Sequence, residues 1–202
     1  MRRLLILFLV FGVMVSLSMC IEGIWKHPGK YDRSSESFGE VGYSSSGDSN
    51  KVDLIIAGQP TQLVLRTGVK EAMATELINT NDSDIVRSYL SHKIIYIEYN
   101  RSLSPEEGML SIIDLSLKLG FLRPLYGHLI VEDSVFKNES EREKVKNSNI
   151  TLILKVVRGN RGATIEKVDN RTYIIEGNSL KELDKAVSRY VLAIYKGVAE
   201  KG

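Results

Sequence analysis

The stretch TYIIEGNSLKELDKAVSRYVLAIY, from Thr172 to Tyr195, contains a strand pattern followed directly by a helix pattern. Residues Thr172 to Ile175 are mostly β-branched or aromatic, which predicts a strand. Ser179 and Glu182 form a capping box, the signal of a helix start. Apolar residues then recur at the spacing of one helix face, at Leu180, Leu183, Val187, Tyr190, Val191, Ile194 and Val198.

Two further strands are predicted immediately before this unit. Residues Ala163 to Val168 are separated from the strand at Thr172 by Asp169-Asn170, a hairpin signal, so the chain should end in a ββα unit. The apolar run Ile150 to Val157 predicts a central strand. The polar segment Glu139 to Asn149 predicts a solvated loop or an exposed helical turn.

The strongest helix start lies further upstream, at Ser104-Pro105-Glu106-Glu107. Ser104 and Glu107 fit a capping box, and Pro105 takes the first helical position, where its missing N–H does no harm. Apolar residues follow, and Gly120 is expected to end the helix in a left-handed conformation. The residues concerned are Met109, Ile112, Ile113, Leu117 and Leu119. A short strand is predicted at His128 to Val131.

The first part of the domain follows the same alternation. Val52 to Ala57 predicts a strand that Gly58-Gln59-Pro60 ends. Helices are expected at Val69 to Asn79 and from Ser83 or Asp84 to Leu90, and a strand at Ile94 to Tyr99. Strands separated by helices favour parallel crossovers, and the late hairpin adds an antiparallel section. The fold class is therefore α/β (α+β mixed), with a mixed sheet packed by helices in a single domain of residues 51–202.

The amino terminus has the order of a secretory signal peptide over residues 1–19. Arg2 and Arg3 precede an apolar run from Leu4 to Val15, and small residues follow. The run is short for a bilayer span, which needs about 20 apolar residues. Cleavage and a permanent amino-terminal anchor both remain open.

Cys20, the single cysteine of the chain, stands where the apolar run stops. Leu17-Ser18-Met19-Cys20 resembles a lipobox, in which the cysteine is diacylated and becomes the first residue; the lipobox has Gly, Ala or Ser where this chain has Met19. Two acyl chains would hold the protein on a membrane. Residues 20–50 are rich in Ser and Gly and lack a periodic apolar pattern, so they predict a flexible tether.

Composition excludes several classes of function. The formal net charge is +2, and Arg2 and Arg3 lie in the predicted signal, so a nucleic-acid binder is not expected. One cysteine excludes an internal disulfide or a thiolate zinc cluster, and three scattered histidines offer no evident metal site. No metal and no cofactor are expected. Walker, dinucleotide-binding, zinc-protease and nucleophile-elbow motifs are all lacking in the folded domain.

Two loops are weak candidates for ligand binding. Gln59 and Thr61 follow the first predicted strand, and ligands of α/β sheets bind beyond the carboxyl ends of strands. A turn that merely ends the strand is the simpler interpretation. Arg158 and Arg161 flank a turn that could hold a phosphate or an acidic glycan, with a solvated hairpin loop as the alternative.

Five Asn-x-Ser/Thr triplets lie at element ends or in loops, where a glycan could project into water. The glycosylation candidates are Asn81, Asn100, Asn138, Asn149 and Asn170.

Two segments resemble archaeal surface proteins. Met19-Cys20-Ile21 with the Ser/Gly tether resembles archaeal lipoproteins, and Thr172 to Gly177 leading into Leu180 to Tyr195 is similar in pattern to modules of S-layer-type envelope proteins. The resemblance implies a location and a class, and no functional residues.

The sequence therefore predicts an exported lipoprotein on the extracellular face of the cell membrane, attached by a lipid or a signal anchor. Its domain would have a non-catalytic binding or envelope-structural role, with an envelope protein or a glycan as partner. A solute-binding component of a transporter would instead need a pocket near Gly58. A surface hydrolase would need an acid partner for His92 or His128.

Overall fold

The computed structural model describes residues 49–99 and 105–200, without the side chains of residues 105–108. The predicted signal peptide, Cys20, nearly all of the predicted tether and Asn100 lie outside the described residues. The described elements share one hydrophobic core.

A six-stranded mixed sheet forms the centre of the domain, in the order β3-β7-β8-β6-β4-β5. Strands β8, β6, β4 and β5 run parallel to one another, β7 is antiparallel to β8, and β3 is parallel to β7. The predicted mixed sheet with a closing ββα unit is therefore confirmed. The strand bounds are β3 Glu76–Ile78, β4 Ile94–Tyr99, β5 Leu129–Glu132, β6 Thr151–Arg158, β7 Thr164–Lys167 and β8 Thr172–Gly177.

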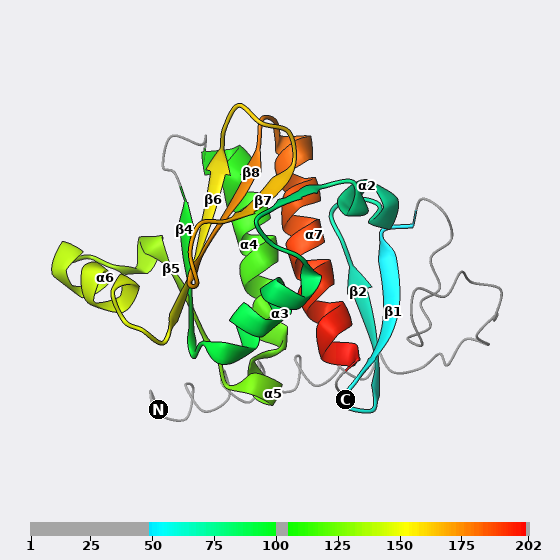
Figure 1. Ribbon diagram of the computed structural model, residues 1–202, viewed down its shortest axis with the longest axis horizontal. Coiled ribbons are helices and arrows are strands. Elements are labelled where there is room, and N and C mark those ends of the chain that lie inside the picture. The colour runs from blue at the N-terminus through cyan, green and yellow to red at the C-terminus, as the bar shows by residue number, and fades with distance from the viewer. Residues whose placement is uncertain (1–48, 100–104, 201–202) are drawn as a thin grey trace, which may run out of the picture. The chain divides into compact units, whose positions relative to one another are not determined.

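Two crossovers place helices on opposite faces of this sheet. Helix α4 (Pro105–Phe121) and the short α5 (Arg123–Tyr126) connect β4 to β5, and η1 (Asp133–Val135) with α6 (Glu139–Lys146) connects β5 to β6. Figure 1 shows α4 on the same side of the sheet as the carboxyl-terminal helix α7 (Leu180–Ala199), with α6 on the other side. Strand side chains alternate between the faces, so Ile95 and Ile97 join the main core while Tyr96 lies beneath α6.

Helix α7 is buried along most of its length. Its apolar side chains from Leu183 to Val198 contact the sheet, α4 and α3 (Asp82–Ser91). A hairpin covers α7 on the side away from the sheet, formed by β1 (Lys51–Ile56) and β2 (Gln59–Val64). The inner side chains of the hairpin and of Leu65 just after it are apolar and buried, at Val52, Leu54, Ile56, Leu63 and Leu65.

The prediction that Gly58-Gln59-Pro60 ends the strand without a following strand was wrong, because these residues lead directly into β2. Ala57 and Gly58 have φ values of 50° and 75°, the left-handed conformation that a tight two-residue turn requires. Gln59 and Pro60 then begin β2, in which Pro60 pairs with Ile55. A proline is tolerated here because every second amide of an edge strand points away from its partner strand and needs no hydrogen bond within the sheet.

Three predicted helix boundaries were also wrong. The helix expected at Val69 to Asn79 is only α2 (Val69–Met73), and the chain then forms β3 beside β7. Helix α3 is capped by Asn81, which accepts a hydrogen bond from the amide of Asp84 at 2.9 Å. Helix α4 continues through Gly120, and the left-handed glycine is Gly127 after α5, with a φ of 70°.

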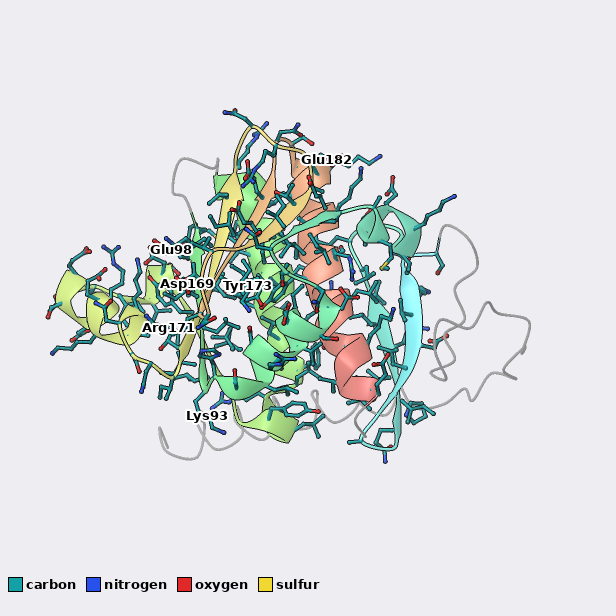
Figure 2. The ribbon with its side chains drawn as sticks, in the orientation of Figure 1. Lys93, Glu98, Asp169, Arg171, Tyr173 and Glu182 are labelled. Carbon is teal, nitrogen blue, oxygen red and sulfur yellow. The ribbon has the colours of Figure 1, made fainter. Side chains whose placement is uncertain are left out.

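Most of the polar segment Glu139 to Asn149 forms helix α6 with no buried residue, so of the two predicted alternatives the exposed helix is the one observed. Its ends are satisfied by side chains: Asn138 accepts from the amide of Ser140 at 2.9 Å, and Arg171 donates to the carbonyl of Ser148 at 2.5 Å. Figure 2 shows Arg171 beside Asp169 at the sheet, on the α6 side. None of the helices in the described ranges is long and apolar enough to cross a membrane.

Replacing Gly177 with Ala should destabilise the fold, because a Cβ at this position would overlap the backbone nitrogen of Leu183 in the first turn of α7. Overpacking of this kind costs about 1–3 kcal/mol in the free energy of unfolding. Gly120→Ala is the matched control, since nothing lies within 4 Å of the added atom. It should instead stabilise α4 by about 0.5–1 kcal/mol. Urea denaturation of both variants measures this difference; equal stabilities would contradict the packing described for Gly177.

Candidate interaction surface on helix α4

The sheet face beneath α6 carries charged side chains that pair with one another. Glu98 on β4 accepts a hydrogen bond from Lys146 of α6 at 3.1 Å and lies 3.9 Å from the Nζ atom of Lys155 on β6. The Nζ atom of Lys146 also lies 5.9 Å from the ring centroid of Tyr96. These contacts attach α6 to the sheet, which is a structural role.

Asp133, at the end of β5, joins the same face to α6. The hydroxyl of Tyr96 donates to Asp133, and Arg142 of α6 lies 3.6 Å from the same carboxylate. Burial, followed by the adjacent Asp133 carboxylate, raises the pKa of Tyr96 well above its ordinary value, so the phenol stays protonated. A neutral phenol held by a carboxylate contributes a hydrogen bond and no nucleophile.

In the candidate ligand-binding loop of Arg158 and Arg161, the chain's own carboxylates occupy the guanidinium of Arg161. Arg161 donates to Glu176 at 2.7 Å and 2.9 Å and to Glu166 at 2.8 Å. These hydrogen bonds raise the pKa of Arg161. Burial by itself would raise the pKa of Glu176, but the same guanidinium lowers it below its ordinary value. Arg158 lies exposed at the end of β6, on the same turn. An anion would have to compete with two carboxylates for Arg161.

Gln59 and Thr61 lie on β2, in the two-stranded hairpin, and not at the carboxyl end of a parallel strand. The hydroxyl of Thr61 donates to the carbonyl of Gln59 at 3.2 Å. The structure therefore does not bring this pair together with Arg158 and Arg161, which belong to the six-stranded sheet. The rule that motivated Gln59 and Thr61 applies to parallel strands and does not extend to this hairpin.

The two described histidines make local contacts: His92 lies beside backbone and serine groups, and His128 lies in an aromatic cluster. The Nδ1 atom of His92 lies 2.7 Å from the carbonyl of Ser88, and the ring of His128 packs 4.4 Å from Tyr89 and 5.9 Å from Tyr126. His128 is almost completely buried. Burial lowers the pKa of His128, and the carbonyl of His92 opposes this shift less strongly.

The four glycosylation candidates within the described ranges differ in how much of the triplet is exposed. Ser83 and Ser140, which complete the triplets of Asn81 and Asn138, are exposed. Thr151 and Thr172, which complete those of Asn149 and Asn170, are buried in β6 and β8. The hydroxyl of Thr151 donates to the carbonyl of Val145 at 2.8 Å.

The described residues line several hollows. One of about 550 Å³ lies where α2 meets the start of α7. Its charged side chains pair across it, Arg66 with Asp184 at 2.5 Å and Lys181 with Glu71 at 3.1 Å. Within residues 49–99 and 105–200, no group of three His, Cys, Asp or Glu side chains could hold a metal ion.

Helix α4 presents the clearest unpartnered surface of the described part of the chain. Its inner face, at Ile112, Leu115 and Leu119, is fully buried in the core. The opposite face carries a second apolar row, here called the α4 stripe, at Leu110, Ile113, Leu117 and Phe121. Their exposed fractions are 50%, 41%, 60% and 76%. A helix that is apolar on both faces is typical of a buried element, so this face is suited to an interaction.

The sequence contains the residue spacing of the α4 stripe, but the predicted helix ends before the last residue of the stripe. The spacing of i, i+3, i+7 and i+11 marks one side of a helix. A helix that ends at Gly120 leaves Phe121 out of the pattern, and the predicted set of apolar helix residues does not include Leu110. Ile113 and Leu117 belong to the predicted set, and the structure places them on the outer face.

The two faces of α4 predict effects of very different size for a leucine-to-alanine substitution. Leu117→Ala should change the free energy of unfolding by less than about 0.5 kcal/mol, because the side chain is exposed. Leu115→Ala, two residues away on the buried face, should cost about 2–5 kcal/mol. Urea denaturation checks both values. A large loss for Leu117→Ala would mean that this face is covered in the folded protein.

The burial of His128 predicts a pH dependence of stability. The unfolded chain binds a proton near pH 6.5, and the folded chain resists it, so stability should fall as the pH is lowered from 7 to 5. His128→Phe should flatten this dependence while filling the aromatic cluster. Carboxylates with lowered pKa values, such as Glu176, titrate below this window. Urea denaturation at pH 5, 6 and 7 tests the slope, and an unchanged slope in the variant would contradict the assignment.

Comparison with known proteins identifies one informative relative. No family model matches the chain, and no solved structure matches it. The uncharacterised protein MJ0259 of Methanocaldococcus jannaschii is 33% identical over an alignment of 223 residues, which covers 98% of this chain and 98% of the relative. At this coverage the alignment includes most of residues 1–48 as well as the folded domain. The chain belongs to the same family as this M. jannaschii protein.

Proposed function

We propose that the chain is an exported, membrane-tethered cell-surface lipoprotein whose domain has a non-catalytic binding or envelope-structural role. The observation that carries the binding role is the α4 stripe, an exposed apolar row on a helix whose other face is already buried in the core. Exposed apolar rows are typical of surfaces that contact another molecule or a membrane.

The proposed location rests on residues 1–20. The order of Arg2-Arg3, an apolar run and Cys20 is typical of an export signal with a lipid attachment site. The alignment with the M. jannaschii protein runs through most of this segment, so the amino-terminal region is shared within the family. A tether at Cys20 and a surface on α4 would act together, since one fixes the place and the other makes the contact.

The catalytic and solute-binding alternatives have less support. A hydrolase would use His92 or His128, and these rings pack against Ser88 and the tyrosine cluster. A solute-binding component would need a pocket near Gly58, which lies in the exposed turn of the β1–β2 hairpin.

Cys20→Ala tests the tether in the protein purified from its natural host. The unaltered protein should fractionate with membranes and give a mass that starts at Cys20 and includes acyl chains, because two chains are enough to anchor it. The variant should lack this mass. Ser35→Ala, outside the lipobox-like motif, is the control and should keep it.

Two results distinguish the forms of the proposal. A membrane-bound chain that begins at Met1 without lipid would replace the lipoprotein by a signal-anchored protein. An unmodified chain beginning at Met1 in the cytosol would overturn the proposed function altogether.

A further inference from the structure

Helix α4 has an outer face without a partner among the described residues, and the four residues of the α4 stripe on this face are all apolar. The α4 stripe runs from Leu110 to Phe121, and Leu125 of α5 extends it beyond the helix end. The neighbouring charges are held at its borders. Asp114 pairs with Lys118 on one side, and Glu132 accepts a hydrogen bond from Ser116 at 2.6 Å on the other.

We infer that the α4 stripe rests on the surface of the membrane to which the chain is attached. This inference rests on the proposed function, because it needs a tether at the amino terminus. The stripe and Leu125 would enter the boundary between headgroups and acyl chains, as the apolar face of an interfacial helix does. The domain would then be held against the bilayer in one orientation.

The length of chain before the domain supports a bilayer as the occupant. About 30 residues separate Cys20 from β1. A flexible Ser/Gly-rich linker of this length has a root-mean-square extension of about 30 Å, similar to the diameter of a small domain. The tether would keep the stripe within reach of the membrane at a high effective concentration, so a weak apolar contact is sufficient.

The charges along α4 favour entry of its carboxyl end. In the sequence, Glu106 and Glu107 precede the stripe, and Arg123 follows Phe121. Arg123 is exposed and has no ion pair within the described ranges. A cation beside an apolar row suits an anionic membrane surface, whereas acidic residues at the other end are repelled by it.

A second copy of the chain is a weaker candidate for this face. A stable protein interface buries about 800 Å² on each partner. The few exposed side chains of the stripe supply roughly a few hundred Å². The stripe is therefore small for a stable dimer and adequate for a tethered contact.

A single tryptophan can report whether the stripe meets lipid. Trp25 is the only tryptophan of the chain, so Trp25→Phe gives a background without this fluorophore. Phe121→Trp in this background places the probe on the stripe. Ile55→Trp is the control, because Ile55 is 61% exposed on the outer face of β1, away from α4.

Both full-length variants would be purified from host membranes and reconstituted in vesicles of phosphatidylcholine and anionic phosphatidylglycerol with brominated acyl chains. The Phe121→Trp protein should lose about half of its fluorescence relative to vesicles without bromine, because interfacial residues reach the acyl boundary. The Ile55→Trp protein should keep its fluorescence. Flotation of the same samples measures attachment separately.

Each outcome decides a different point. Flotation with quenching of the Phe121→Trp protein alone supports the inference. Flotation without quenching overturns it and leaves the proposed tether standing, and a dimer in sedimentation under the same conditions would assign the stripe to a second copy. A protein that does not float overturns the proposed function and the inference with it.

Discussion

Burial of helix α7 is the constraint on which the rest of the domain depends. The helix is apolar around much of its circumference, so the sheet can cover only one side of it. The β1–β2 hairpin covers the side away from the sheet, and α3 and α4 pack beside the helix. Gly177 allows the strand before α7 to pass close to its first turn, since any side chain there would meet the backbone of Leu183. The hairpin is thus best understood as a cover for α7 rather than as a member of the main sheet.

Helices α7 and α4 are both apolar on more than one face, but the chain covers these faces to different extents. For α7 the chain supplies a cover on every side, whereas for α4 the described chain covers one face and leaves the other to solvent. The domain can fold around its core without any contact at the α4 stripe. This separation between folding and contact is expected of a surface used for binding.

Local patterns predicted the fold class because the longest elements carry strong periodicity and caps. Ser179 does accept from the amide of Glu182, at 3.2 Å, and α4 does begin at Pro105. The errors fall where a distant partner decides the structure. Strand β3 has only three residues and forms because it pairs with β7, which lies far along the chain. Strand β2 follows a tight turn, and the proline at position 60 made this segment resemble the end of a strand. Strand order and the pairing of Arg161 with Glu166 and Glu176 are likewise contacts between remote residues. The outer face of α4 was different, since its spacing is present in the sequence and needs no distant partner.

Because Thr151 and Thr172 are buried, the Asn-x-Ser/Thr triplets differ in whether an enzyme can modify them before or after the domain folds. An enzyme that transfers a glycan must read the whole triplet, and in the folded domain the threonine of Asn149 is sealed in β6. Asn81 and Asn138 cap helices at the surface and keep their triplets open after folding. A sugar on Asn149 would therefore record that the chain met the transferase while still unfolded, and sugars restricted to Asn81 and Asn138 would record that it met the enzyme as a finished domain.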